Sequence, residues 1–406
     1  MMKYIVLLGD GMADYPLAEL GGKTPLAAAR TPNMDLMARD GILGLVDTIP
    51  RGFKAGSDVA NLSVLGYDPA ECFSGRGPLE AANMGVKLGP GDVAFRCNLV
   101  TLGKGEDPLM EDFTAGHIGS AEAAEIIKSL DRKLGNEEFN FYPGVSYRHL
   151  FVWRNGSAEM ETTPPHDITG RPSRSHLPRG EGKEILLAVM NKAREVLADH
   201  PVNLERAARG EKTANAIWLW GQGRAPRMLP LTERYGLSGG VISAVDLLNG
   251  IGVYAGLQPI RVAGATGYID TDYRGKACGA LEALRDMDFV FVHVEAPDEM
   301  GHEGNIEGKI KAIEDFDEKV VGTVLAGMAA LKEVRVLVLS DHPTPISIRT
   351  HAADPSPFVV YPTPTGEAHR PGTAFSEEAA AATGLLISPG HQLMDRFIGK
   401  GQGFFA

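Results

Sequence analysis

The chain has 406 residues, of which 44% are hydrophobic, so it can bury a large core and should divide into two or three domains of roughly 100–200 residues each. Its 52 acidic and 40 basic residues give a formal net charge of -12, which argues against non-specific nucleic-acid binding. No run approaches the roughly 20 apolar residues of a membrane span, and the first residues lack the apolar core of a signal peptide. Cys72, Cys97 and Cys278 form no C-x-x-C pair and are typical of reduced thiols, so the sequence predicts a soluble cytoplasmic protein.

The first predicted element is a buried strand at residues 3–8, followed by a glycine-flanked turn that carries Asp10. A helix beginning near Pro32 and a strand at residues 42–49 come next. Residues 52–69 then predict a glycine-hinged loop that leads into a short helix, with Ser57 at or beside its N-terminus. Free backbone N–H groups and the helix dipole at such a position favour an alkoxide or a phosphate.

The pattern changes between about residues 70 and 240. Strands with one polar face are predicted at residues 92–102 and 145–153, and helices at residues 120–134 and 181–199. These elements indicate a separate α+β domain at 70–240, whose loops are rich in arginine and histidine. Any one of these loop residues is as consistent with a solvated surface as with a binding site, because charged loop residues are usually exposed.

From about residue 240 an alternation of strands and helices returns, with crossover helices predicted at residues 274–285 and 306–331. The predicted strand at 287–294 leads into a helical turn with Asp298 and His302 four residues apart, on one face. The further strands are expected at 240–245, 259–263, 334–339 and 357–361. The pattern as a whole predicts the α/β class, with a doubly wound, mostly parallel sheet built from residues 1–69 and 241–406.

The strand at 334–339 ends in Asp341 and His342, and His351 follows nine residues later. Polar residues at the carboxyl ends of parallel strands meet where open α/β sheets bind their ligands. Strand ends and helix starts together give seven candidate residues with three carboxylates, three imidazoles and one hydroxyl. They are Asp10, Ser57, Asp298, His302, Asp341, His342 and His351. Each alone could be a helix cap or a satisfied core residue, but together they predict a site large enough for two divalent ions.

Several motifs carry a resemblance to a known family. They are Gly9-Asp10-Gly-Met-Ala-Asp14, Gly56-Ser57-Asp58-Val-Ala-Asn61, Gly75-Arg76-Gly77-Pro-Leu-Glu80, Trp218-Leu-Trp-Gly-Gln-Gly223, Gly264-Ala-Thr-Gly-Tyr-Ile-Asp270, Glu295-Ala-Pro-Asp298-Glu-Met-Gly-His302 and Ser340-Asp341-His342. With these motifs the chain resembles the cofactor-independent phosphoglycerate mutases of the archaeal type, within the alkaline phosphatase superfamily. The resemblance covers nearly the whole chain.

The resemblance implies an alkaline phosphatase-like domain interrupted by an inserted substrate domain, and a phosphoserine formed on Ser57. One metal would lie among Asp10, Ser57, Asp341 and His342, and the other among Asp298, His302 and His351. Manganese is the metal that the resemblance favours, with zinc, iron or magnesium as alternatives. A small phosphorylated metabolite would be the partner, and a homo-oligomer is compatible with the sequence. The inserted domain offers these substrate contacts: Arg76, Asp112, His117, His166, Asp167 and Arg171.

Residues 112–117 depart from the Asp-Arg-x-Ala-Gly-Arg pattern that we expect in such mutases, because Phe113 and His117 stand where that pattern has arginines. The anionic substrate would then need other arginines, for which Arg76, Arg96, Arg148, Arg171 and Arg179 are available. A homoserine kinase-like phosphotransferase or a phosphomonoesterase on the same metal site is therefore the alternative prediction. A metal-free hydrolase using the G-x-S-x-G match at residues 236–240 lacks the preceding strand that a nucleophile elbow requires.

Overall fold

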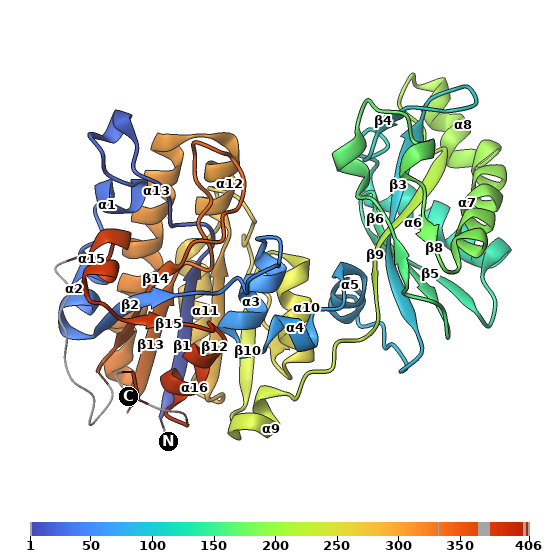
Figure 1. Ribbon diagram of the computed structural model, residues 1–406. Helices are drawn as coiled ribbons and strands as arrows, with labels where there is room; N and C mark the ends of the chain where they lie inside the picture. Colours follow the sequence, from blue (N-terminus) through green and yellow to red (C-terminus); the bar gives the residue numbers. More distant parts are fainter. Residues whose placement is uncertain (1, 332, 364–373, 401–402, 405–406) are drawn as a thin grey trace. The chain divides into compact units, whose positions relative to one another are not determined.

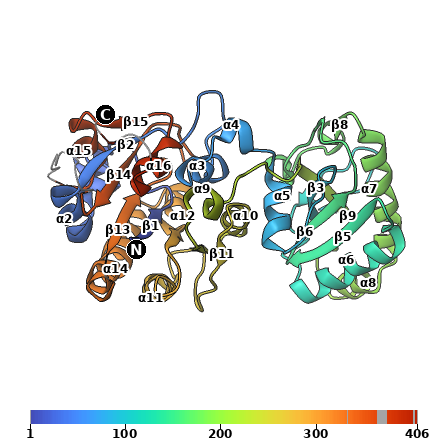
Figure 2. The same cartoon turned by 90° about the horizontal axis from the view of Figure 1, so that it is seen from below.

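The computed structural model describes residues 2–331, 333–363, 374–400 and 403–404. It divides into two compact units, the first made of Met1–Phe73 and Arg227–Ala406 and the second of Ser74–Pro226. Figures 1 and 2 show the elements of each unit. The inserted domain was expected at residues 70–240, but the second unit begins at Ser74 and ends at Pro226. The short helix α9 (Leu231–Tyr235) belongs to the first unit, where Arg234 pairs with Asp395 at 2.9 Å.

The first unit is organised around an eight-stranded sheet in the order β11-β10-β12-β1-β13-β14-β2-β15. Among the described residues, its neighbouring pairs are parallel except the two that β14 makes. The predicted α/β class with a mostly parallel sheet is confirmed. The strands are β1 (Lys3–Gly9), β2 (Ile42–Val46), β10 (Gly239–Ile242), β11 (Gln258–Pro259), β12 (Phe289–Val294), β13 (Val334–Leu339), β14 (Ser356–Tyr361) and β15 (Leu386–Ile387).

Helices cover both faces of this sheet, which is why its central strands are continuous apolar runs. On one face, Ile5 and Leu7 of β1 join a core with α2 (Pro32–Asp40), α11 (Tyr273–Ala283) and α13 (Ile306–Asp315). On the other, the Tyr4 ring lies 5.5 Å from the ring of Phe397 on α16 (Gln392–Ile398). The other helices of the unit are α1 (Pro25–Ala28), α3 (Ser57–Val64), α4 (Pro69–Cys72), α10 (Asp246–Tyr254), α12 (Ala296–Glu303), α14 (Gly322–Gly327) and α15 (Glu377–Ala382), with 3-10 turns at Ala18–Leu20 and Met328–Ala330.

The crossover expected at residues 306–331 is helical but not uniform. Between α13 and α14 the chain forms a π-helical turn at Phe316–Val321. Within this turn the buried Asp317 carboxylate accepts hydrogen bonds from the backbone N–H groups of Asn33 and Met34, at 3.2 and 2.7 Å. The negative charge therefore satisfies the N-terminus of α2 and ties that helix to the crossover.

The second unit is an α+β domain around five antiparallel strands, β4-β3-β6-β5 with β9 paired to β3. They are β3 (Val93–Leu102), β4 (Met110–Asp112), β5 (Phe139–Val145), β6 (Arg148–Trp153) and β9 (Ala216–Gly223). One strand was expected at 145–153, but the chain turns at Ser146, which adopts a φ of 53°. Residues 145–153 therefore comprise the end of β5, the turn and β6 of a hairpin. Its helices are α5 (Arg76–Asn83), α6 (Ser120–Leu134), α7 (Lys183–Ala198) and α8 (Pro201–Ala208), with 3-10 turns at Pro165–Ile168 and Arg174–His176 and a small sheet of β7 (Met160–Glu161) and β8 (Arg179–Gly180).

We find no helix in the described ranges that is both long and apolar enough to cross a membrane.

Candidate metal centre

The carboxyl ends of three adjacent central strands place most of the predicted site residues together. β1 lies between β12 and β13 in the sheet, so residues that follow these strands emerge side by side. Asp10 follows β1 and the pair Asp341 and His342 follows β13, and all three are fully buried. Asp298 and His302 stand on α12, the helix that begins directly after β12.

A first group of donor atoms consists of Asp10, Asp341 and His342, whose ligand atoms lie within 4.8 Å of one another. The Nε2 atom of His342 lies 3.5 Å from Asp10 Oδ1 and 3.6 Å from Asp341 Oδ2. Ser57, the first residue of α3, brings its Oγ atom to 3.2 Å from the same nitrogen. The hydroxyl predicted from the glycine-hinged loop therefore belongs to this group.

A second group consists of Asp298, His342 and His351, again within 4.8 Å. His302 adjoins it, because its Nε2 atom lies 2.9 Å from His351 Nε2 and 3.2 Å from Asp298 Oδ2. All seven residues selected from the sequence thus lie in one cluster, and His342 is near both groups.

The donor set fits divalent cations. The Oδ1 atom of Asp10 is buried and has no hydrogen-bond partner in the described part of the chain. His302 donates a hydrogen bond from Nδ1 to the carbonyl of Arg349 at 3.0 Å, which directs its Nε2 atom towards Asp298 and His351. Such a bond to the second ring nitrogen is what orients histidine ligands in metalloproteins.

The electrostatics of the cluster indicate the same chemistry. Burial, followed by repulsion from Asp341, raises the pKa of Asp10 well above its ordinary value. Burial also opposes ionisation of Asp298, but hydrogen bonds from His302 and His351 bring its pKa well below the usual range. The hydrogen bond to Asp298 raises the pKa of His302 to about 9. Without a metal, bound protons offset the negative charge of the crowded carboxylates in this cluster. Divalent cations would take the place of these protons.

Sequence reasoning missed a buried histidine beside Asp10. His293 is fully buried in β12, with Nε2 2.8 Å from Asp10 Oδ2 and Nδ1 3.2 Å from the Ser243 hydroxyl. Burial, then the charge of Lys276, lowers the pKa of His293 to about 3, so the ring is neutral. The available signal was one polar residue inside an otherwise apolar strand.

Two further side chains orient the carboxylates. Asn61 donates from Nδ2 to Asp341 Oδ2 at 2.9 Å, and the Thr344 hydroxyl donates to Asp298 Oδ1. Because these bonds leave the carboxylates little rotational freedom, the cluster is held in one arrangement.

The predicted substrate residues of the second unit fall partly into one group, which we call the arginine–aromatic cluster. The guanidinium of Arg96 stacks 4.5 Å from the centre of the Trp220 ring and lies 3.3 Å from Glu80. Burial lowers the pKa of Arg96, Glu80 opposes this, and the charges of Arg76 and Arg148 add to it. The cluster comprises Arg76, Arg96, Arg148, Phe113, Tyr147, His166 and Trp220.

The other predicted contacts have different surroundings. The exposed His117 ring lies 6.3 Å from that of Tyr147, and Asp167 is exposed beside His166. Asp112 is bound within its own unit by Thr114 and Lys212; these hydrogen bonds outweigh burial and lower its pKa to about 2. Arg171 is exposed, and no contact in the described residues joins its side chain to the cluster.

The fold and the cluster define an α/β protein with a carboxylate–imidazole centre of the divalent-cation type at its sheet edge. The family model for 2,3-bisphosphoglycerate-independent phosphoglycerate mutase matches residues 38–203. The chain is 56% identical over 401 residues to a protein of Geobacter sulfurreducens called a probable 2,3-bisphosphoglycerate-independent phosphoglycerate mutase, covering 98% of this chain and 100% of that one. It is 57% identical over 381 residues to the mutase of Methanosarcina barkeri, covering 93% and 95%.

Two solved structures share the fold over nearly the whole chain. A Pyrococcus horikoshii protein superimposes with a TM-score of 0.82 at 31% identity, covering 100% of this chain and 99% of that one. The cofactor-independent phosphoglycerate mutase of Thermoplasma acidophilum gives 0.69 at 27% identity, covering 99% and 100%. The chain belongs to the 2,3-bisphosphoglycerate-independent phosphoglycerate mutases, a family of isomerases, and the resemblance predicted from its motifs is confirmed.

Proposed function

We propose that this protein interconverts 3-phosphoglycerate and 2-phosphoglycerate by way of a phosphoserine on Ser57. The observation that carries the proposal is the position of the Ser57 hydroxyl, at the first residue of α3 and 3.2 Å from His342 Nε2 in the metal-ligand cluster. A hydroxyl placed there can carry a phosphoryl group, because the helix N-terminus favours the negative charge.

We assign two divalent cations to the cluster, one held by Asp10, Ser57, Asp341 and His342 and the other by Asp298, His302 and His351. Manganese is our preferred metal, with zinc and magnesium as alternatives. When bound, such cations lower the pKa of a coordinated hydroxyl and offset charge on phosphoryl oxygens in the transition state.

The residues of the chain perform the rest of the reaction. The Oγ atom of Ser57 forms a bond to phosphorus as the ester bond to glycerate breaks, and the glycerate oxygen takes up the proton that the serine loses. The reverse transfer to the other hydroxyl of the retained glycerate gives the isomer. Escape of glycerate before this second transfer would make the protein a phosphatase, so exclusion of water is essential to the mutase.

We propose that the arginine–aromatic cluster recognises the carboxylate of the glycerate. Arg96 is held by stacking and by Glu80, and Arg76 and Arg148 add positive charge around it. A pre-oriented guanidinium binds a carboxylate with two parallel hydrogen bonds. This recognition would compensate for the arginines that residues 113 and 117 lack.

The second candidate function, phosphorylation of homoserine from ATP, rests on one observation. Phe113 packs 5.8 Å from the Tyr147 ring and 6.0 Å from the His166 ring, so an aromatic group stands where the mutase pattern has an anion-binding arginine. The two functions share Ser57 and the metals, and they differ in donor and acceptor.

An enolase-coupled assay with manganese tests the proposal directly. We expect turnover of 3-phosphoglycerate, with a loss of at least about 1000-fold in Ser57→Ala, because the covalent route disappears. Ser63→Ala is the matched control, since Ser63 lies on the same helix and its hydroxyl donates to the carbonyl of Thr48, not to a residue of the cluster. Formation of phosphohomoserine from ATP and homoserine without mutase turnover would reject the mutase and favour the kinase.

A further inference from the structure

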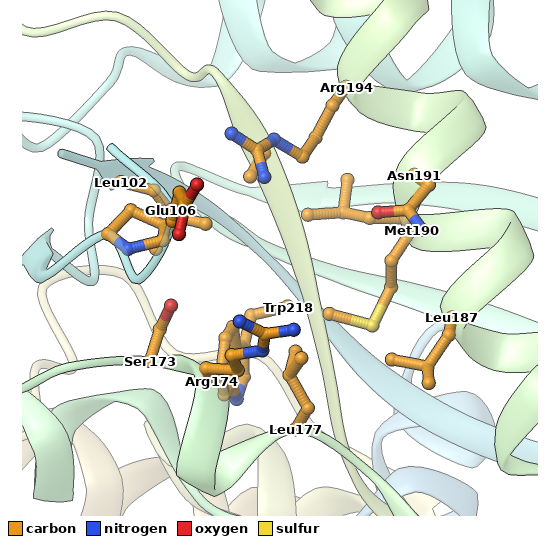
Figure 3. Close-up of a pocket in the computed structure, with 13 residues that line it drawn as sticks. Leu102, Glu106, Ser173, Arg174, Leu177, Leu187, Met190, Asn191, Arg194 and Trp218 are labelled. Atoms are coloured by element: carbon orange, nitrogen blue, oxygen red, sulfur yellow. The ribbon is translucent and has the colours of Figure 1, made fainter. Parts of the chain in front are cut away.

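The second unit contains a cavity of about 570 Å³ beside β9 (Figure 3). This volume lies within the range of about 300–1,000 Å³ that small-molecule sites occupy. The cavity lies between β9, α7, the end of β3 with the segment that follows it, and the 3-10 turn at Arg174–His176. The lining residues that matter for binding are Glu106, Ser173, Arg174, Met190, Arg194 and Trp218.

The charged groups around the cavity favour an anion. Figure 3 shows the guanidinium groups of Arg174 and Arg194 and the carboxylate of Glu106 around the same space. Neither guanidinium forms an ion pair with any residue in the described ranges. Two cations and one anion leave a net charge of about +1, which suits a monoanion better than a polyanion.

A buried hydroxyl also faces the cavity. Ser173 is only 3% exposed, and its Oγ atom has no hydrogen-bond partner within the described residues. The wall that carries it is fixed, because the backbone N–H of Ser173 donates to the carbonyl of Pro108 at 2.9 Å and that of Arg174 donates to Asp107 at 3.0 Å. The hydroxyl is therefore held in place for a ligand to bind.

Apart from Asn191, the rest of the lining is apolar. Trp218 is 1% exposed and already donates its indole N–H to the carbonyl of Thr163, so it offers the cavity only apolar ring surface. Leu177 and Met190 extend this surface. A ligand with an apolar or aromatic body would displace water that finds few hydrogen bonds there.

We propose that this cavity binds a small monoanion with an apolar or aromatic body, whose acidic group lies between Arg174 and Arg194 and whose body packs on Leu177, Met190 and Trp218. This site goes beyond the proposed function, because phosphoglycerate is a small polyanion without apolar surface. None of the residues assigned to the metal centre or to the arginine–aromatic cluster lines the cavity.

The test uses the folded full-length protein and the fluorescent aromatic sulfonate 1-anilinonaphthalene-8-sulfonate as probe. We expect saturable binding at one site, with energy transfer from tryptophan because Trp218 lines the cavity. Arg174→Glu and Arg194→Glu should each weaken binding about tenfold or more, since each replaces an attraction by a repulsion. Asn191→Trp, which fills the cavity without changing its charge, should weaken binding as well.

Lys192→Glu is the matched control, because it makes the same change of charge on α7 at a residue that lines a different cavity of about 440 Å³. Equal weakening by Lys192→Glu, binding at several sites, or displacement of the probe by 3-phosphoglycerate would overturn the inference. The arginine variants should keep wild-type mutase turnover, and this readout separates failure of the cavity proposal from failure of the proposed function.

Discussion

Lys309→Met is predicted to destabilise the first unit, because it breaks a buried ion pair between α13 and the loop after β1, which carries the proposed metal ligand Asp10. Lys309 is fully buried on α13 and donates to Asp14 at 2.7 Å, to the carbonyl of Thr344 at 2.9 Å and to that of Ala13 at 3.2 Å. Asp14 lies in the loop after β1, and Thr344 in the loop after β13. One ammonium group thus joins the loop of Asp10 to the loop that carries Asp341 and His342.

The magnitude follows from what the substitution leaves behind. Asp14 would keep its hydrogen bonds from the N–H groups of Tyr15, at 2.8 Å, and Ile346, at 3.2 Å, but would lose its counter-charge in a buried position. Removing one partner of a buried pair typically costs about 3–5 kcal/mol in unfolding free energy. Because the uncompensated charge causes most of this loss, Lys309→Met combined with Asp14→Asn should recover about half or more of it.

The arrangement of tryptophans supplies an internal control for the measurement. The chain has 3 tryptophans, Trp153, Trp218 and Trp220, and all lie in the second unit. In a urea titration, far-UV circular dichroism should therefore register the loss in the first unit while tryptophan fluorescence keeps its midpoint. A loss below about 1 kcal/mol, or no recovery in the double variant, would show that the Lys309–Asp14 pair does not stabilise the first unit.

Three further predictions concern metal binding and pH. Elemental analysis should find two divalent ions per chain in the wild type, and Asp341→Ala or His302→Ala should reduce this content and abolish activity with the circular dichroism spectrum unchanged. His293→Asn should weaken manganese binding by about 10–100-fold in calorimetry, because it removes the contact at 2.8 Å that orients Asp10; an unchanged affinity would count against that role. Burial lowers the pKa of His149 to about 3 from the ordinary 6.5, so its protonation favours the unfolded state. Above pH 6.5 the free energy of unfolding of the second unit, measured by tryptophan fluorescence, should therefore carry no penalty from His149. Between pH 6.5 and pH 3 it should fall by up to about 1.4 kcal/mol per pH unit, and the slope should be shallower in His149→Gln.

The sequence predicted the side-chain cluster at the sheet edge because several of its members follow strands that periodicity identifies. Asp10, Asp341 and His342 each come directly after an apolar run, and parallel pairing in the sheet brings the ends of such runs together. The strand at Val334–Leu339 and the helix at Ser120–Leu134 have the predicted bounds, since clear apolar patterns specify both. Local pattern and sheet topology were sufficient for these elements.

The residues that support the ligands could not be predicted in this way. His293 contacts Asp10 across 283 positions, and Lys309 contacts Asp14 across 295. Each is one polar residue within an apolar or amphipathic pattern, and its partner is determined only by the three-dimensional packing. The boundary expected at 240 failed for a similar reason, because the contact between Arg234 and Asp395 joins distant segments.

Detection of a phosphoserine at Ser57 would decide whether the phosphoryl group passes through this residue. The metal-loaded protein would be incubated with 3-phosphoglycerate, quenched in acid and mapped by mass spectrometry of its peptides. We expect a phosphoryl group on the peptide that contains Ser57, formed only with metal and substrate present and absent from Ser57→Ala. Conversion of 3-phosphoglycerate to 2-phosphoglycerate by the Ser57→Ala variant, with no phosphorylation of the wild-type peptide during turnover, would contradict this expectation.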